Sequence, residues 1–168
     1  MRSGIFVLTL LFSISFAQIA SAHGGEESSG LSNIQVLIIS GASSIVFFIL
    51  FVVVKKYEAI VARSNLYSLV LFTAFVHILL GVEDPLLIAG GVGVLSATFM
   101  PILFNFSKQI NQLADLALGL IVLSMLIGYF VSNHDLHLIL EDFLGIIAKL
   151  VELGILVLLV KQYVFTHR

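Results

Sequence analysis

The chain has 168 residues, of which 60% are hydrophobic and 11% are charged, whereas a soluble domain carries about 25% charged residues. Its formal net charge of -2 is too small to favour nucleic acid or a strongly acidic partner. The absence of cysteine excludes disulfide frameworks, thiolate catalysis and cysteine zinc sites. This composition predicts a membrane protein.

The first segment, residues 1–22, has the pattern of a secretory signal peptide: Arg2 precedes an apolar stretch, and Ala20 and Ala22 are the small residues before a cleavage site. We expect the mature chain to begin at His23, outside the cytoplasm. The alternative is an uncleaved first span, but the apolar stretch is shorter than the roughly 20 residues that cross a bilayer. Residues 23–33 are rich in Gly, Ser and Glu, which predicts a flexible extracytoplasmic tail.

The remaining residues, 34–168, are predicted to form an all-α domain of five transmembrane helices. Helices are expected because an unpaired peptide group in lipid costs several kcal/mol. Each of five apolar stretches has about the length that spans a bilayer as a helix. They lie at residues 34–54, 66–82, 86–106, 113–131 and 138–160.

Basic residues fix the expected orientation, because Lys and Arg collect in cytoplasmic connections. With the mature N-terminus outside, every connection that carries Lys or Arg falls on the cytoplasmic side, which predicts an N-out, C-in topology. The residues concerned are Lys55, Lys56, Arg63, Lys108, Lys161 and Arg168.

A stripe of small residues marks the third predicted span. Gly90, Gly93 and Ala97 recur on one helix face, where another backbone could approach closely. We interpret the stripe as a packing feature.

The predicted outer face gathers imidazoles and carboxylates without a basic residue. Such a surface attracts cations, and neutral imidazole suits nickel, copper and zinc. The alternative is that acidic outer loops only follow the positive-inside rule, which explains the missing Lys and Arg but not the clustering of His. The residues are His23, Glu26, Glu27, Glu83, Asp84, His134, Asp135, His137, Glu141 and Asp142.

The densest part of this face is residues 132–142. If the fifth helix starts at Ser132 or Asn133, either residue can cap it. His134, His137 and Glu141 then share one helix face at a spacing suited to metal ligands. The alternative is a capped helix start that carries surface histidines.

A second group is the segment HILLGVEDP, residues 77–85. In one continuous helix, His77, Gly81 and Asp84 share a face, with His77 about 10 Å deeper. Glu83 and Asp84 would then form the mouth of a metal route and His77 an inner station, since ionisable groups within a membrane are functional candidates. The alternative is a neutral histidine hydrogen-bonded between helices.

Three more ionisable residues lie in predicted spans. Lys149 and Glu152, at i and i+3, are expected to pair, because a lone charge there costs at least about 2.5 kcal/mol. The pair either locks the fifth span against its neighbours or serves as a proton-coupled or gating element. Asp115 is interpreted as a helix-terminus anion.

The stretch HILLGVEDPLLIAGGVGVL, residues 77–95, resembles the segment of HupE/UreJ proteins in which a His is followed by an Asp-His pair and a Leu-rich span. The general plan of signal peptide, mature start with His and Gly, and apolar helices is also similar. The resemblance implies a nickel or related metal permease of the kind that serves hydrogenase and urease. His77 matches the first His, Glu83 matches the Asp, and Asp84 replaces the second His.

The sequence thus predicts a small membrane protein that handles or transports nickel or a similar divalent metal (Ni, Cu or Zn), with no enzymatic activity and no organic cofactor. Its expected partners are the lipid bilayer, the metal and other membrane subunits or copies of itself. The alternative is an accessory subunit of a membrane metalloenzyme such as a copper-dependent ammonia or methane monooxygenase, because a mature N-terminal His23 could chelate copper through its amine and ring.

Overall fold

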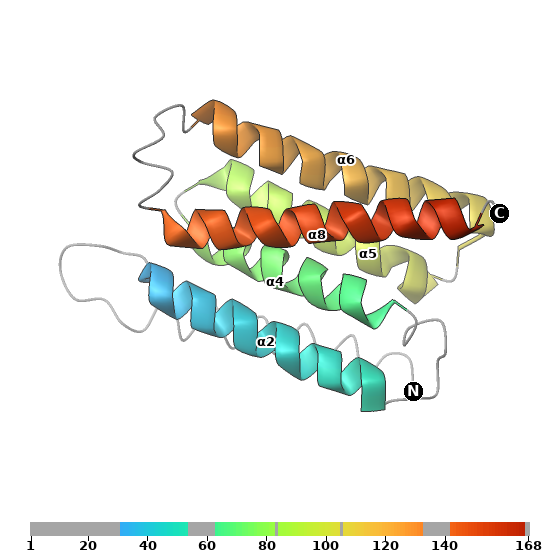
Figure 1. Cartoon of the computed structure of the whole chain (residues 1–168), viewed down its shortest axis with the longest axis horizontal. Helices are drawn as coiled ribbons and strands as arrows, with labels where there is room; N and C mark the ends of the chain where they lie inside the picture. The colour runs from blue at the N-terminus through green and yellow to red at the C-terminus, as the bar shows by residue number, and fades with distance from the viewer. Residues whose placement is uncertain (1–30, 54–62, 83, 105, 133–141, 167–168) are drawn as a thin grey trace.

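The computed structural model describes residues 31–53, 63–82, 84–104, 106–132 and 142–166. Within these ranges the secondary structure is entirely helical, with five α-helices and no strand (Figure 1). The predicted signal peptide, the start His23 and residues 24–30 of the predicted tail lie outside the described residues, whereas residues 31–33 are described and Asn33 begins α2. The helices are α2 (Asn33–Val53), α4 (Ser64–Leu80), α5 (Pro85–Phe104), α6 (Lys108–Ser132) and α8 (Phe143–Thr166).

The first three helices agree with the predicted spans to within two residues at each end, whereas α6 and α8 differ. α6 begins at Lys108, ahead of the predicted start, because its first turns are built from Lys, Gln and Leu, which favour helix despite their mixed polarity. A start of the last helix near Ser132 or Asn133, the condition for the predicted histidine face, is not met: Ser132 ends α6 and α8 starts at Phe143. Asp142 provides the cap, since its Oδ1 accepts a hydrogen bond from the Gly145 N–H at 2.8 Å.

The helices run up and down, so that each is antiparallel to the next along the chain (Figure 1). The starts of α2, α5 and α8 lie at the same end of the bundle as the ends of α4 and α6. α4 is the central helix and packs against α2, α5 and α8, while α6 packs against α5 and α8. Short connections between antiparallel neighbours are the usual solution for a helical bundle.

α4 is largely enclosed, and twelve of its residues are buried. On one side Ser44 of α2 and Ser68 of α4 exchange hydrogen bonds: each hydroxyl donates to the other residue's carbonyl, at 2.8 and 3.0 Å. On another side Gly91 of α5 lies against α4, where an added Cβ would stand 2.8 Å from the Ala74 carbonyl oxygen. Hydroxyls and glycines at such contacts let two helix backbones approach closely.

The glycine stripe occupies a different place from the one its sequence pattern suggested. A Cβ on Gly90 would meet the Met125 sulfur at 3.2 Å, and one on Gly93 would meet the Ile121 side chain at 3.5 Å. This face of α5 therefore packs on side chains of α6. The close backbone approach is made by Gly91, which belongs to the neighbouring face.

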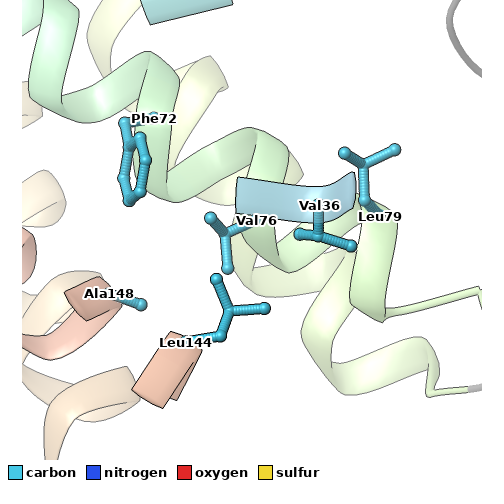
Figure 2. Close-up of a cluster of buried hydrophobic side chains, with 6 residues drawn as sticks. All are labelled: Val36, Phe72, Val76, Leu79, Leu144 and Ala148. Atoms are coloured by element: carbon cyan, nitrogen blue, oxygen red, sulfur yellow. The ribbon is translucent and has the colours of Figure 1, made fainter. Parts of the chain in front are cut away.

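Two apolar clusters form the core. The first joins α2, α4 and α8 near the end of the bundle where α8 begins, and Figure 2 shows its six buried side chains converging. The second joins α4, α5, α6 and α8. The first consists of Val36, Phe72, Val76, Leu79, Leu144 and Ala148, and the second of Leu66, Val70, Val94, Leu118, Val122 and Ile155.

The outer surface of the bundle is also apolar. Large hydrophobic side chains stand out from every described helix, with Leu86 82% and Val131 70% exposed. Exposed apolar patches larger than a few hundred Å² are rare on soluble monomers and mark surfaces that contact a membrane or another protein. Four helices, all except α4, are long and apolar enough to cross a membrane. α4 has 17 residues, or about 25 Å of helix.

Candidate functional site

Four polar side chains meet in the interior between α4 and α8. Thr73 and Glu152 are fully buried, and His77 and Lys149 are 5% and 7% exposed. Apart from these residues, the buried surface of α4 and α8 is largely apolar. Buried charges are tolerated only when they are paired and hydrogen-bonded, so the contacts within this polar cluster decide what it can do.

Lys149 and Glu152 form the predicted ion pair. The Lys149 Nζ lies 2.7 Å from Glu152 Oε1 and 2.9 Å from Oε2, so the ammonium donates to both carboxylate oxygens. One turn separates the two residues on α8, which is the spacing at which helix side chains meet. The prediction that the two charges pair is confirmed.

His77 faces the same carboxylate from α4. Its Nδ1 lies 2.8 Å from the Thr73 carbonyl oxygen of its own helix, and because a carbonyl only accepts, Nδ1 carries the hydrogen. In the neutral ring Nε2 is then the unprotonated nitrogen. Nε2 lies 3.5 Å from Glu152 Oε1.

In the neutral histidine, Nε2 and Glu152 Oε1 are two electron-pair donors that face each other. A lone pair on Nε2 and a carboxylate oxygen repel each other unless a proton or a cation lies between them. Two metal bonds of about 2.1 Å at the tetrahedral angle place nitrogen and oxygen ligands about 3.4 Å apart, close to the observed 3.5 Å. A ring N–H held by a backbone carbonyl is also the usual support of a histidine ligand. His77 and Glu152 therefore have donor types and a separation compatible with metal ligands, while Lys149 already donates to both carboxylate oxygens.

α6 completes the surroundings of Lys149. The Met125 carbonyl oxygen accepts a hydrogen bond from Nζ at 3.3 Å, and Nζ lies 5.2 Å from the centre of the Tyr129 ring, within the range of a cation–π contact. The Tyr129 hydroxyl donates to Asp142 Oδ2 at 3.1 Å. The residue that caps α8 thus also positions the ring beside Lys149.

Thr73 connects the two sides of the polar cluster. Its hydroxyl donates to Glu152 Oε1 at 3.4 Å, while its carbonyl accepts from His77. Thr73 is one turn from His77 on α4, so both residues face α8 together.

Two of the predicted metal ligands, His77 and Asp84, belong to the described residues, and the structure does not place them on one helix. α4 ends at Leu80, and Asp84 lies outside it, where its Oδ1 accepts a hydrogen bond from the Leu86 N–H at 2.9 Å. The premise of a continuous helix from His77 to Asp84 is therefore wrong, because the chain turns at Gly81 and a new helix starts at Pro85.

The other predicted ligands lie outside the described residues. These are His23, Glu83, His134, His137 and Glu141. Within the described part of the chain, no group of three or more His, Cys, Asp or Glu side chains is arranged to hold a metal ion.

The sequence did not indicate that His77 and Glu152 share a site. The signal that could have joined them is that both are ionisable residues in the interior of apolar spans. A second missed contact is the pair of Arg63 and Asp115, whose Nη2 and Oδ1 lie 2.6 Å apart. The interpretation of Asp115 as a helix-terminus anion is thus wrong, since α6 begins at Lys108, almost two turns earlier.

Comparison of the chain with protein-family models, with curated proteins and with solved structures gave no match.

Proposed function

We propose that this chain is a small multi-pass protein of the cell membrane that takes a divalent transition metal, nickel or a similar ion, from the extracytoplasmic side and transports it or hands it on. The metal is cargo, and the protein carries out no covalent chemistry. In this proposal the five described helices all span, N-out and C-in, and the HupE/UreJ resemblance remains the expected relationship.

The observation that carries the proposal is the pair of His77 and Glu152. In the neutral ring of His77, the imidazole nitrogen without a hydrogen faces a carboxylate oxygen at 3.5 Å, inside the bundle. Imidazole suits nickel, copper and zinc, and ionisable residues inside membrane bundles mark ion pathways. The separation is close to the one expected between two ligands of a tetrahedral site, which zinc prefers, so zinc and cobalt belong in the assay beside nickel and copper.

The ends of the bundle supply the second support. The end where α4 leads into α5 carries Asp84, and the opposite end carries Arg63 and Lys108. This distribution agrees with an inner face at Arg63 and Lys108, where basic residues collect. Glu83 and Asp84 would attract a cation to the outer end through their formal charge. His134, His137, Glu141 and the mature N-terminal His23 remain the proposed outer ligands.

The test is uptake of radiolabelled nickel, cobalt, copper and zinc into proteoliposomes that contain the purified full chain. His77→Ala should abolish most of the uptake, and Glu83→Gln with Asp84→Asn should reduce it at low metal concentration, because capture depends on charge. Thr98→Val is the matched control: Thr98 is also buried, but its hydroxyl bonds to its own helix at Val94.

Normal uptake by His77→Ala would remove this route. If the wild type shows no uptake but co-purifies with larger membrane subunits and copper, the accessory-subunit alternative takes its place.

N-terminal sequencing of the purified protein should give His23, and an intact Met1 would remove the N-terminal chelate. Tags at Asn133 and at the C-terminus should report opposite sides of the membrane, and accessibility of both from outside would refute the five-span topology.

A further inference from the structure

We propose that Lys149 is a tethered competitor of the metal. Its ammonium occupies the Glu152 carboxylate when the site holds no metal, and it withdraws to the face of α6 when a divalent cation bridges His77 Nε2 and Glu152. This inference rests on the proposed function and adds to it the device that regulates access to the site.

The first step concerns the carboxylate. Glu152 is fully buried, and a charge so placed needs a counter-charge. Lys149 supplies it through hydrogen bonds to both oxygens. Both oxygens of the metal-binding carboxylate are thereby taken by an ammonium that belongs to the protein.

The second step concerns the conflict between the two cations. The proposed metal ion would lie between His77 Nε2 and Glu152 Oε1, yet Lys149 Nζ lies 2.7 Å from the same Oε1. A divalent ion and an ammonium on one oxygen repel each other, and this repulsion is little screened in a dry interior. Metal binding therefore requires Lys149 to withdraw.

The third step is that the ammonium, in the position where it bonds to Glu152, already has other partners on α6. Nζ contacts the Met125 carbonyl oxygen at 3.3 Å and the face of the Tyr129 ring at 5.2 Å. Both groups accept a cation, and both belong to α6, away from His77 on α4. A small rotation of the flexible lysine side chain, with its four-carbon stem, would move the ammonium off Glu152 and keep these two partners.

Among the described groups that face Lys149 and Glu152, no other cationic side chain competes with the metal for the carboxylate. α4 contributes Thr73 and His77, and α6 contributes Met125 and Tyr129. The charged residues of α6, Lys108 and Asp115, lie in its first turns, at the opposite end of the bundle from Tyr129. A protein cation that competes for the site keeps metal binding weak enough for release, as conduction requires.

The experiment measures metal affinity as the concentration of Ni²⁺ or Zn²⁺ that gives half-maximal thermal stabilisation of the full chain in detergent. Lys149→Gln and Lys149→Met should bind at least about tenfold more tightly than the wild type, because removing a like-charged neighbour relieves a strong repulsion. The gain should disappear when Glu152→Gln is added to Lys149→Gln. Lys161→Gln, an exposed lysine on the same helix, is the matched control and should leave the affinity unchanged.

A second pair of variants keeps Lys149 and tests its contact with the Tyr129 ring on α6. Tyr129→Leu removes the ring face and should weaken metal binding, whereas Tyr129→Phe keeps the ring and should bind as the wild type does. The inference requires both results. Unchanged or weaker affinity in both Lys149 variants overturns it, and so does equal affinity in the two Tyr129 variants.

The proposed function fails separately from the inference. If the wild type takes up metal but the Lys149 variants gain no affinity, the transport proposal stands and the competitor is refuted. If the Lys149 variants gain affinity while the wild type takes up no metal, the competitor stands and transport is refuted. If no variant binds metal, both are refuted.

Discussion

Replacing Glu152 by methionine should destabilise the bundle by about 3–5 kcal/mol, because it leaves the buried Lys149 ammonium without its carboxylate. At the observed Nζ–Oε1 distance of 2.7 Å, the gross attraction is about 6 kcal/mol for an effective dielectric constant of about 20. The net loss is smaller because Lys149 keeps the Met125 carbonyl and the Tyr129 ring. We therefore expect a value near the lower limit, about 3 kcal/mol.

The double variant distinguishes the loss of the whole ion pair from the loss of one of its two residues. Lys149→Met alone should also lose about 3 kcal/mol, whereas Lys149→Met with Glu152→Met should be nearly neutral, since apolar residues of similar volume often replace a buried ion pair without loss. The assay is reversible unfolding in mixed micelles with increasing dodecyl sulfate, followed by circular dichroism. A loss below about 1 kcal/mol for Glu152→Met, or additive effects of the two substitutions, would refute the reasoning, because contacting charges must couple.

Two further predictions use the same unfolding assay. Gly91→Ala should lose about 1–3 kcal/mol by overpacking, because its Cβ would meet the Ala74 carbonyl oxygen at 2.8 Å. The control Gly128→Ala, which has open space around it, should be at least as stable as the wild type. Equal stability of both variants would contradict the described packing of α5 on α4. Asp115→Asn should lose less than about 1 kcal/mol, because the side chains of Arg63 and Asp115 are 27% and 39% exposed. The loss should shrink further at high salt. A loss of several kcal/mol would contradict this, because it would require the pair to be enclosed.

The sequence determined the helical class and most of the helix limits. Apolar stretches of about 20 residues can satisfy their peptide groups in lipid only as helices, and this local requirement placed α2, α4 and α5 to within two residues of their predicted ends. It also predicted the contact between Lys149 and Glu152, because residues three apart on a helix meet whatever lies around them.

Local pattern failed where polar residues change the limits of a helix. The first turns of α6 contain Lys108 and neighbouring polar residues, which hydropathy excludes from a span although their helix propensity is high. The sequence offers Ser132 and Asn133 as caps of the last helix, but Ser132 ends α6. The structure selects Asp142, whose carboxylate also accepts the Tyr129 hydroxyl of α6.

The tertiary structure alone decided which distant residues meet. Thr73 and Glu152 are 79 residues apart, and Arg63 and Asp115 are 52 residues apart, so neither contact follows from a helical period. These contacts depend on which helices are neighbours and on how each is rotated about its axis. Gly91 fixes part of this arrangement, because its missing side chain lets α5 lie against the α4 backbone beside Ala74. Hydropathy sets the number and length of helices one at a time, whereas their relative rotation is a property of the packed bundle as a whole.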